Sequence, residues 1–447
     1  EPHLRLTDQS NAWSFGYAFV CLLLVATALT MFRLIPGGTA TRAFRALARD
    51  HAARSSRIPW RRKLRWVALA AVPATWMLAL TSYLTTGLAP VPLLWVIPLA
   101  LYLLSFTIVF ATRPMVSQTW LRRALPFLII PLVGTLQLHA SGPLWFLGML
   151  HVSTFFVAAL VCHGELAAER PAASHLTAYY LWLAVGGVLG GSFAGLVAPL
   201  IFSSFAEYPI AVVALCLLVP LRGAIVGRAL RRSDLLLPVA VAVVVIGAAV
   251  ALDRFGINDP SVQRTLIFGP AAVLAFAASA RPLRFGLAIA ALLLASSVPV
   301  GAHEDQLFAA RDFFGVDRVT VSEPGTQHIL YSGNIVHGAQ HLDSSTRDEP
   351  LTYYSKGGPL GDLFAGLSLS AGAHVSVIGL GAGSMACYSG AGQNWNFLEL
   401  HPLVRQTPVD PKLSTFLPDF PPAHHSPPPC RGPAPLPPAP TPTPPSR

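Results

Sequence analysis

A glycine-rich turn is the part of this sequence best suited to binding a ligand. Residues 374–378 predict a short β-strand, and the sequence GLGAG at residues 379–383 follows it directly. Residues 384–387 then predict the start of a helix. Glycines allow a tight turn and let a ligand approach the backbone closely. A strand, a glycine turn and a helix in this order are typical of a nucleotide-binding α/β unit.

An acidic residue lies near the end of the next predicted strand. This strand covers residues 396–400 and contains Glu399. A carboxylate there can accept hydrogen bonds from both hydroxyl groups of a ribose. The wider glycine spacing of the dinucleotide fingerprint is missing, so the turn favours an adenosyl-sulfonium ligand over NAD. That ligand would be S-adenosylmethionine or its decarboxylated form; the alternative is a glycine-rich loop in a generic α/β domain.

The residues before this unit predict a small antiparallel sheet. Three short strands are expected at 318–322, 327–332 and 335–340, with turns at Pro324-Gly325 and Gly333-Asn334. Apolar residues at helical spacing predict a helix over residues 359–370.

The composition of the whole chain indicates a membrane protein. Of the 447 residues, 53% are hydrophobic and only 12% are charged, whereas a soluble domain carries about 25% charged residues. A membrane-spanning helix needs about 20 mostly apolar residues, and about ten segments approach this length. They are roughly residues 13–35, 66–84, 89–112, 124–139, 143–163, 178–204, 208–221, 235–252, 264–280 and 284–302.

Four regions are therefore expected. Residues 1–302 form a polytopic α-helical membrane domain, and residues 303–358 form the β-hairpin unit. Residues 359–420 begin a partial α/β domain, Rossmann-like and of the S-adenosylmethionine-dependent methyltransferase type. Residues 421–447 are rich in proline and are expected to be a disordered tail.

The net charge of +10 indicates orientation in a lipid bilayer. Residues 33–65 hold ten Arg and Lys residues and a single acid, Asp50, which places this loop in the cytoplasm. We therefore expect no nucleic-acid partner. Ten crossings would place the residues after 302 outside the cell. An adenosyl-sulfonium ligand is made inside the cell, so the sequence leaves open on which side of the membrane these residues lie.

Metal and disulfide chemistry are not expected. The five cysteines include no CxxC pair, and three of them, Cys21, Cys162 and Cys216, lie in apolar runs. The glycines of residues 186–195 have a spacing that allows close helix packing; packing is the favoured interpretation, and a substrate path is the alternative.

Several motifs together resemble a known family: bacterial inner-membrane proteins in which a spermidine-synthase-like domain follows a transmembrane region. In the membrane part the resemblance lies in TSYL at 81–84, PLLWVIPL at 92–99, CHGEL at 162–166 and EYP at 207–209. In the polar part it lies in FFGV at 313–316, HGAQ at 337–340, PLTYY at 350–354 and VIGLGAG at 377–383. The family reaction is aminopropyl transfer from decarboxylated S-adenosylmethionine to a polyamine.

The resemblance implies roles for seven residues. The co-substrate, decarboxylated S-adenosylmethionine or S-adenosylmethionine itself, would be bound by Gln340, Gly379, Gly381, Gly383 and Glu399. The polyamine would lie against Tyr353 and Tyr354. No tightly bound cofactor is implied, and whether the chain forms a homo-oligomer stays open.

Departures from the family pattern affect catalysis. Ala382 stands where the synthases carry an aspartate that helps to bind the amino group of the ligand, and His401 replaces the second acid of a Glu-x-Asp pattern. We find no counterpart of the catalytic carboxylates before the proline-rich segment, so no catalytic residue is assigned and this chain is expected to be inactive. The alternative is a membrane transporter or regulatory protein whose degenerate synthase domain senses a nucleoside or polyamine.

Overall fold

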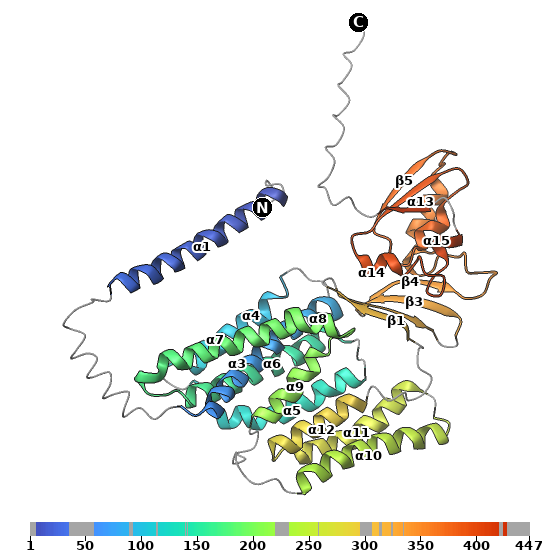
Figure 1. The fold of residues 1–447 in the computed structure, drawn as a ribbon. Helices are drawn as coiled ribbons and strands as arrows, with labels where there is room; N and C mark the ends of the chain where they lie inside the picture. The colour runs from blue at the N-terminus through green and yellow to red at the C-terminus, as the bar shows by residue number, and fades with distance from the viewer. Residues whose placement is uncertain are drawn as a thin grey trace. The chain divides into compact units, whose positions relative to one another are not determined.

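The computed structural model is drawn in Figure 1. It describes residues 6–34, 58–88, 93–112, 115–138, 140, 142–219, 232–257, 259–295, 306–312, 315–322, 325–333, 335–419 and 423–426. The chain divides into two units, residues 1–62 with 171–177 and residues 63–170 with 178–447. Within the first unit, α1 (Leu6–Leu34) is a long apolar helix, and η2 (Ala173–His175) is a short 3-10 turn.

Helices make up the first part of the second unit. The longer ones are α3 (Trp60–Ser82), α4 (Val96–Val109), α5 (Gln118–Gln137), α6 (Leu144–Ala168), α7 (Leu176–Ser192), α9 (Glu207–Leu218), α10 (Ser233–Arg254), α11 (Pro260–Ala278) and α12 (Pro282–Ala295). Two π-helical turns, η1 (Tyr83–Leu88) and η3 (Phe193–Val197), and the short α8 (Ala198–Ile201) extend α3 and α7.

Each of the ten predicted apolar segments overlaps a helix. Among the described residues, five helical stretches are long and apolar enough to cross a membrane: Trp60–Thr86, Gln118–Gln137, Leu144–Ala168, Ala173–Ile201 and Asp234–Leu252. The other five contain shorter apolar stretches: Asn11–Thr27, Val96–Val109, Glu207–Leu218, Thr265–Ala278 and Pro282–Leu294. The prediction of ten complete spans therefore stays a prediction.

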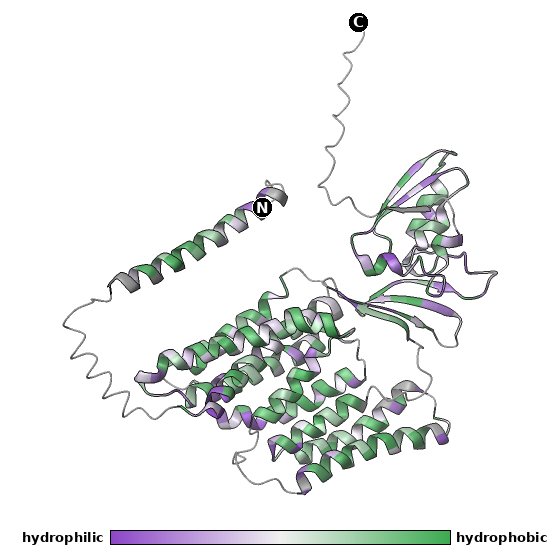
Figure 2. Cartoon of the chain, viewed as in Figure 1, coloured by the Kyte–Doolittle hydropathy of each residue, from purple (hydrophilic) through white to green (hydrophobic). Residues whose placement is uncertain are grey.

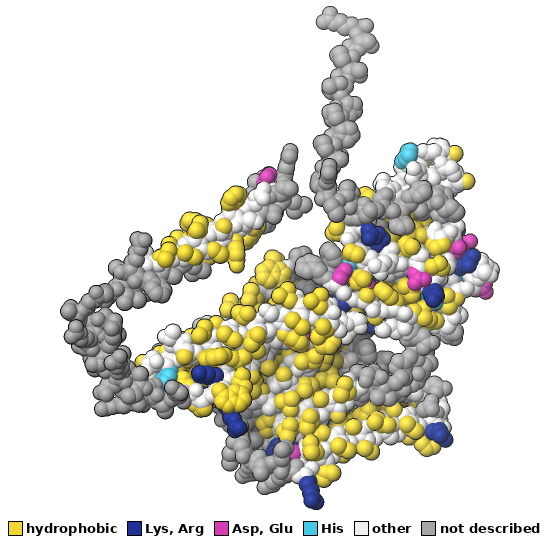
Figure 3. Space-filling view, in the orientation of Figure 1, with side chains coloured by type: hydrophobic (Ala, Val, Ile, Leu, Met, Phe, Trp, Pro, Cys, Tyr) yellow, Lys and Arg dark blue, Asp and Glu magenta, His cyan; other side chains and the backbone are white. Residues whose placement is uncertain are grey.

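The outer surface of this helical region is apolar. Figure 2 shows hydrophobic residues along most of its helices, and Figure 3 shows Lys and Arg side chains near the ends of the region. Large apolar side chains such as Trp145, Val188, Leu200 and Val243 are more than half exposed. An exposed apolar surface of this kind is suited to contact with lipid.

Small residues and ion pairs hold the helices together. A Cβ added at Gly186 would lie 2.5 Å from the carbonyl oxygen of Val67, and one added at Gly190 would lie 2.2 Å from that of Ala71. The close approach of α7 to α3 supports the packing interpretation of these glycines. Glu165 of α6 is paired with Arg65 of α3 and with an arginine of α5, so this buried acid is neutralised.

Two sheets follow the helices. The antiparallel sheet has the order β1-β2-β3-β4 and comprises β1 (Gln306–Arg311), β2 (Val316–Val321), β3 (Gln327–Ser332) and β4 (Ile335–His341). The parallel sheet has the order β5-β6-β7 and comprises β5 (His374–Ile378), β6 (Asn394–Leu398) and β7 (Ala423–Ser426). Short helices connect them: η4 (Thr352–Tyr354), α13 (Pro359–Gly366), η5 (Ser384–Tyr388), α14 (Pro402–Gln406) and α15 (Phe416–Asp419).

All five predicted strands overlap strands of the structure, and other elements differ from the prediction. The strand β1 was not expected, and the predicted helix 359–370 ends at Gly366. The predicted disordered tail is wrong for Ala423–Ser426, because these residues pair with β6 in a parallel ladder; residues 427–447 lie outside the described residues. Three parallel strands with a 3-10 turn between β5 and β6 do not amount to a Rossmann fold, so that domain stays a prediction.

The glycine contact gives a testable expectation. Gly190→Ala should destabilise the helical region by about 1–3 kcal/mol, because the new methyl group would collide with backbone of α3. Gly187→Ala is the matched control, since nothing lies within 4 Å of a Cβ there. Thermal unfolding of the purified protein in detergent, followed by circular dichroism, measures the difference. Equal melting temperatures for the two variants would contradict this account of the packing.

Candidate functional site

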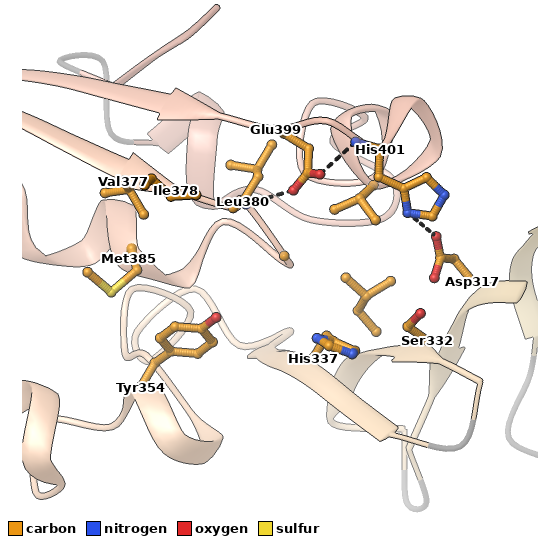
Figure 4. A pocket seen from close by; sticks show the side chains of 14 residues that line it. Asp317, Ser332, His337, Tyr354, Val377, Ile378, Leu380, Met385, Glu399 and His401 are labelled. Atoms are coloured by element: carbon orange, nitrogen blue, oxygen red, sulfur yellow. Dashed lines mark hydrogen bonds and ion pairs between the residues drawn. The ribbon is translucent and has the colours of Figure 1, made fainter. Parts of the chain in front are cut away.

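A cavity of about 390 Å³ lies between the two sheets (Figure 4). Its volume falls within the range of small-molecule sites. The antiparallel sheet and η4 contribute Asp317, Leu330, Ser332, His337 and Tyr354. The parallel sheet and the residues after its strands contribute Val377, Ile378, Gly379, Leu380, Gly381, Met385, Glu399, His401 and Val404.

The glycine turn forms one wall of the cavity. Gly379, Gly381 and Gly383 have φ values of +94°, +57° and +84°, a backbone region that favours glycine. No atom lies within 4 Å of a Cβ added at Gly379, so the backbone there is open to a ligand. Gly383 instead packs against Pro408 and Phe416, and its role is to turn the chain into η5.

Glu399 is held at the edge of the cavity by two backbone groups. It follows the last residue of β6, and its carboxylate accepts hydrogen bonds from the N–H of Leu380 at 2.9 Å and the N–H of His401 at 2.7 Å. One bond goes to each oxygen, so each oxygen keeps a second acceptor position. An oriented carboxylate beside an open glycine turn can accept hydrogen bonds from ligand hydroxyl groups.

Asp317 is a second carboxylate in the same cavity. It is fully buried on β2, opposite Ser332 of β3. Its Oδ2 lies 3.3 Å from Nδ1 of His401, and the Nε2 of that histidine contacts Asp312. Burial is the main cause that raises the pKa of Asp317 above its usual value; a hydrogen bond with Ser332 and then the neighbouring His401 oppose the shift. Two acids therefore share one imidazole.

Tyr354 and His337 complete the polar lining. Figure 4 shows the Tyr354 ring directed into the cavity from the side opposite Glu399. Burial raises the pKa of the Tyr354 hydroxyl, and contact with Tyr353 adds to the shift, so the phenol stays neutral at physiological pH. His337 lies on β4, and its carbonyl oxygen is 3.3 Å from a Cβ added at Gly381.

The structure brings four of the seven predicted residues to the cavity: Gly379, Gly381, Glu399 and Tyr354. Tyr353 packs against Tyr354, with ring centroids 4.4 Å apart and the rings tilted by 42°, but is 51% exposed. Gln340 is buried outside the cavity lining, where its amide contacts the hydroxyl and backbone N–H of Thr415 and the carbonyl oxygen of Arg347. It therefore joins β4 to the segment before α15.

Sequence reasoning missed Asp317 and gave no role to His337 or His401. The sequence pattern of β2 could have indicated Asp317. Asp317 lies on the buried face of this strand together with Val319, and an acidic residue among the inward-facing positions of a strand is unusual. The contact with His401 had no such signal, since it joins residues far apart in the sequence.

Among the residues that the structure describes, no group of three or more His, Cys, Asp or Glu side chains is arranged so that it could hold a metal ion. Comparisons with protein-family models, with curated proteins and with solved structures find no match to this chain. What the cavity does must therefore be argued from its own residues.

The buried carboxylate predicts a pH dependence of stability. Because folding raises the pKa of Asp317, its contribution is fully present below the ordinary aspartate pKa and is lost as pH rises through the raised value. Asp317→Asn should flatten the fall in melting temperature as pH rises above the ordinary aspartate pKa. Melting curves in detergent at a series of pH values test this, with the exposed Glu349→Gln as the control variant. Parallel curves for wild type and Asp317→Asn would contradict the prediction.

Proposed function

We propose that the cavity binds an adenosyl-sulfonium nucleoside and that the chain is a membrane-attached, spermidine-synthase-like protein. The observation that carries the proposal is the position of Glu399. Its carboxylate is oriented by the glycine turn at the carboxyl ends of two parallel strands, where α/β proteins bind nucleosides. The open backbone at Gly379 and the cavity volume support it.

The membrane setting of the proposal is the inner membrane of a bacterium, with the cavity on the cytoplasmic side. Five membrane-length helices support attachment to a bilayer. The cytoplasmic side is where adenosyl-sulfonium metabolites are made.

Aminopropyl transfer to a polyamine is the family reaction, and we propose binding without turnover for this chain. Ala382 is a buried alanine in the turn, where the synthases have a carboxylate for the ligand's amino group. A transfer reaction also needs a base to take a proton from the attacking ammonium group, and no residue of this cavity is assigned that role.

A sensing role is the second candidate function, and one contact favours it. Arg311, at the end of β1, forms a bidentate ion pair with Glu207, the first residue of α9, with both N–O distances 2.7 Å. Its guanidinium also donates to the carbonyl oxygen of Ser204. The next residue, Asp312, contacts His401 of the cavity lining, so a ligand at His401 would act close to the apolar helix α9.

Ligand binding tests the main proposal. Isothermal titration of the purified full chain with decarboxylated S-adenosylmethionine should give saturable binding. Glu399→Gln should weaken it about 10-fold or more, because the variant loses a charged acceptor for the ribose hydroxyls. Glu349→Gln is the control, as it removes an exposed acid outside the cavity. No binding to the wild-type protein would refute the proposal.

Turnover is a separate measurement. Radiolabelled aminopropyl transfer to putrescine or spermidine is expected to stay at background with the purified protein. Transfer above background that disappears in Glu399→Gln would overturn the expectation of inactivity while leaving the binding site in place.

A further inference from the structure

A second cavity, of about 850 Å³, lies among the helices of the second unit. Its walls come from the ends of α5 and α12, from α9 and from η1, and α12 packs against both α9 and α5 (Figure 1). Two of these walls belong to the membrane-length stretches Trp60–Thr86 and Gln118–Gln137. The volume falls within the range of small-molecule sites, and no residue of this cavity lines the one at Glu399.

The contact between α9 and α12 explains where this cavity begins. A Cβ added at Gly286 of α12 would lie 2.5 Å from the side chain of Leu217 and 3.0 Å from its backbone nitrogen, so the two helices are tightly packed there. Further along α12, Ala290 and Leu293 line the cavity instead, as does Val213 of α9. The space therefore opens between two helices that close it at the Gly286 contact.

The lining changes from polar to apolar along α9. Polar side chains lie at helix ends: Tyr83 follows α3, Gln137 is the last residue of α5, and Ser204 precedes α9. Val213 and Leu217 lie roughly 9 Å and 15 Å into α9 at a rise of 1.5 Å per residue. A ligand that fills the cavity must therefore be polar at one end and apolar over the rest of its length.

No charged side chain is among the described residues that line this cavity. The guanidinium of Arg311 lies 4.8 Å from the centre of the Phe205 ring in the lining, but it is already paired with Glu207, and both side chains are buried. The hydroxyl of Tyr208, another lining residue, lies 2.6 Å from Nδ1 of His151. An ionic group would lose its hydration here without gaining an opposite charge, so the ligand should be uncharged.

We propose that this cavity binds one molecule of an uncharged amphipathic lipid. Its hydrogen-bonding end lies near Tyr83, Gln137 and Ser204, and its hydrocarbon chain extends along α9. Ile210 and Leu294 line the cavity and are also exposed, so the cavity reaches the apolar outer surface of the helices, from which a lipid can enter. The inference is independent of the nucleoside site, because the two cavities share no lining residue.

Lipid binding to the purified full chain tests this inference. The protein in detergent is titrated with 1,2-dioleoylglycerol, an uncharged lipid with one hydroxyl group, and native mass spectrometry counts the bound molecules. Wild type should saturate at one molecule. Val213→Trp places a large side chain in the cavity and should weaken binding about 10-fold or more. Val243→Trp is the matched control, since Val243 is exposed on α10 outside the cavity.

A second variant and a second lipid complete the test. Ala290→Phe fills the cavity from α12, and circular dichroism shows whether each variant is folded. Dioleoylphosphatidylglycerol has the same chains with an anionic headgroup and should bind wild type about 10-fold more weakly, a comparison that needs no variant. Absence of saturable dioleoylglycerol binding to wild type, or unchanged binding in a folded cavity-filling variant, would overturn the proposal. Equal affinity for the two lipids would overturn the uncharged headgroup.

Discussion

The Glu399 carboxylate joins the ends of two neighbouring parallel strands, and the shape of the cavity depends on this contact. Its two backbone hydrogen bonds fix the glycine turn after β5 against the chain that leaves β6. His401 is placed by the second of these bonds, two residues beyond the carboxylate. The position of one acid therefore determines where the open glycine backbone and the imidazole that faces Asp317 both lie.

The same electrostatic requirement applies to buried acids in the helices and in the sheets. Low-dielectric surroundings make an unbalanced charge costly, and arginines from neighbouring helices balance Glu165 and Asp234. In the helical region this balance keeps acids compatible with an apolar exterior. At the cavity, Asp317 contacts the imidazole of His401, which Asp312 also contacts.

Local sequence patterns predicted the elements whose structure depends on residues close together in the sequence. The strands β3 and β5 have the predicted bounds, because alternation and glycine turns depend on near neighbours. Glu399 was predicted inside the strand 396–400 but lies one residue beyond β6. Gln340 and Asp317 depend on contacts with residues 415 and 401, which no local pattern encodes. Likewise, β7 lies in a proline-rich segment and is held by pairing with β6, a long-range interaction that overrides its composition.

The adjacent residues Arg311 and Asp312 make the register of β1 critical. Arg311 reaches Glu207 of α9, and Asp312 reaches His401 of the cavity. Successive side chains of an extended chain point to opposite faces, so a shift of one residue would exchange the two and set like charges against each other. An insertion or deletion of a single residue between β1 and β2 would disturb both partners at once, so this short connection should tolerate substitutions far better than changes in length.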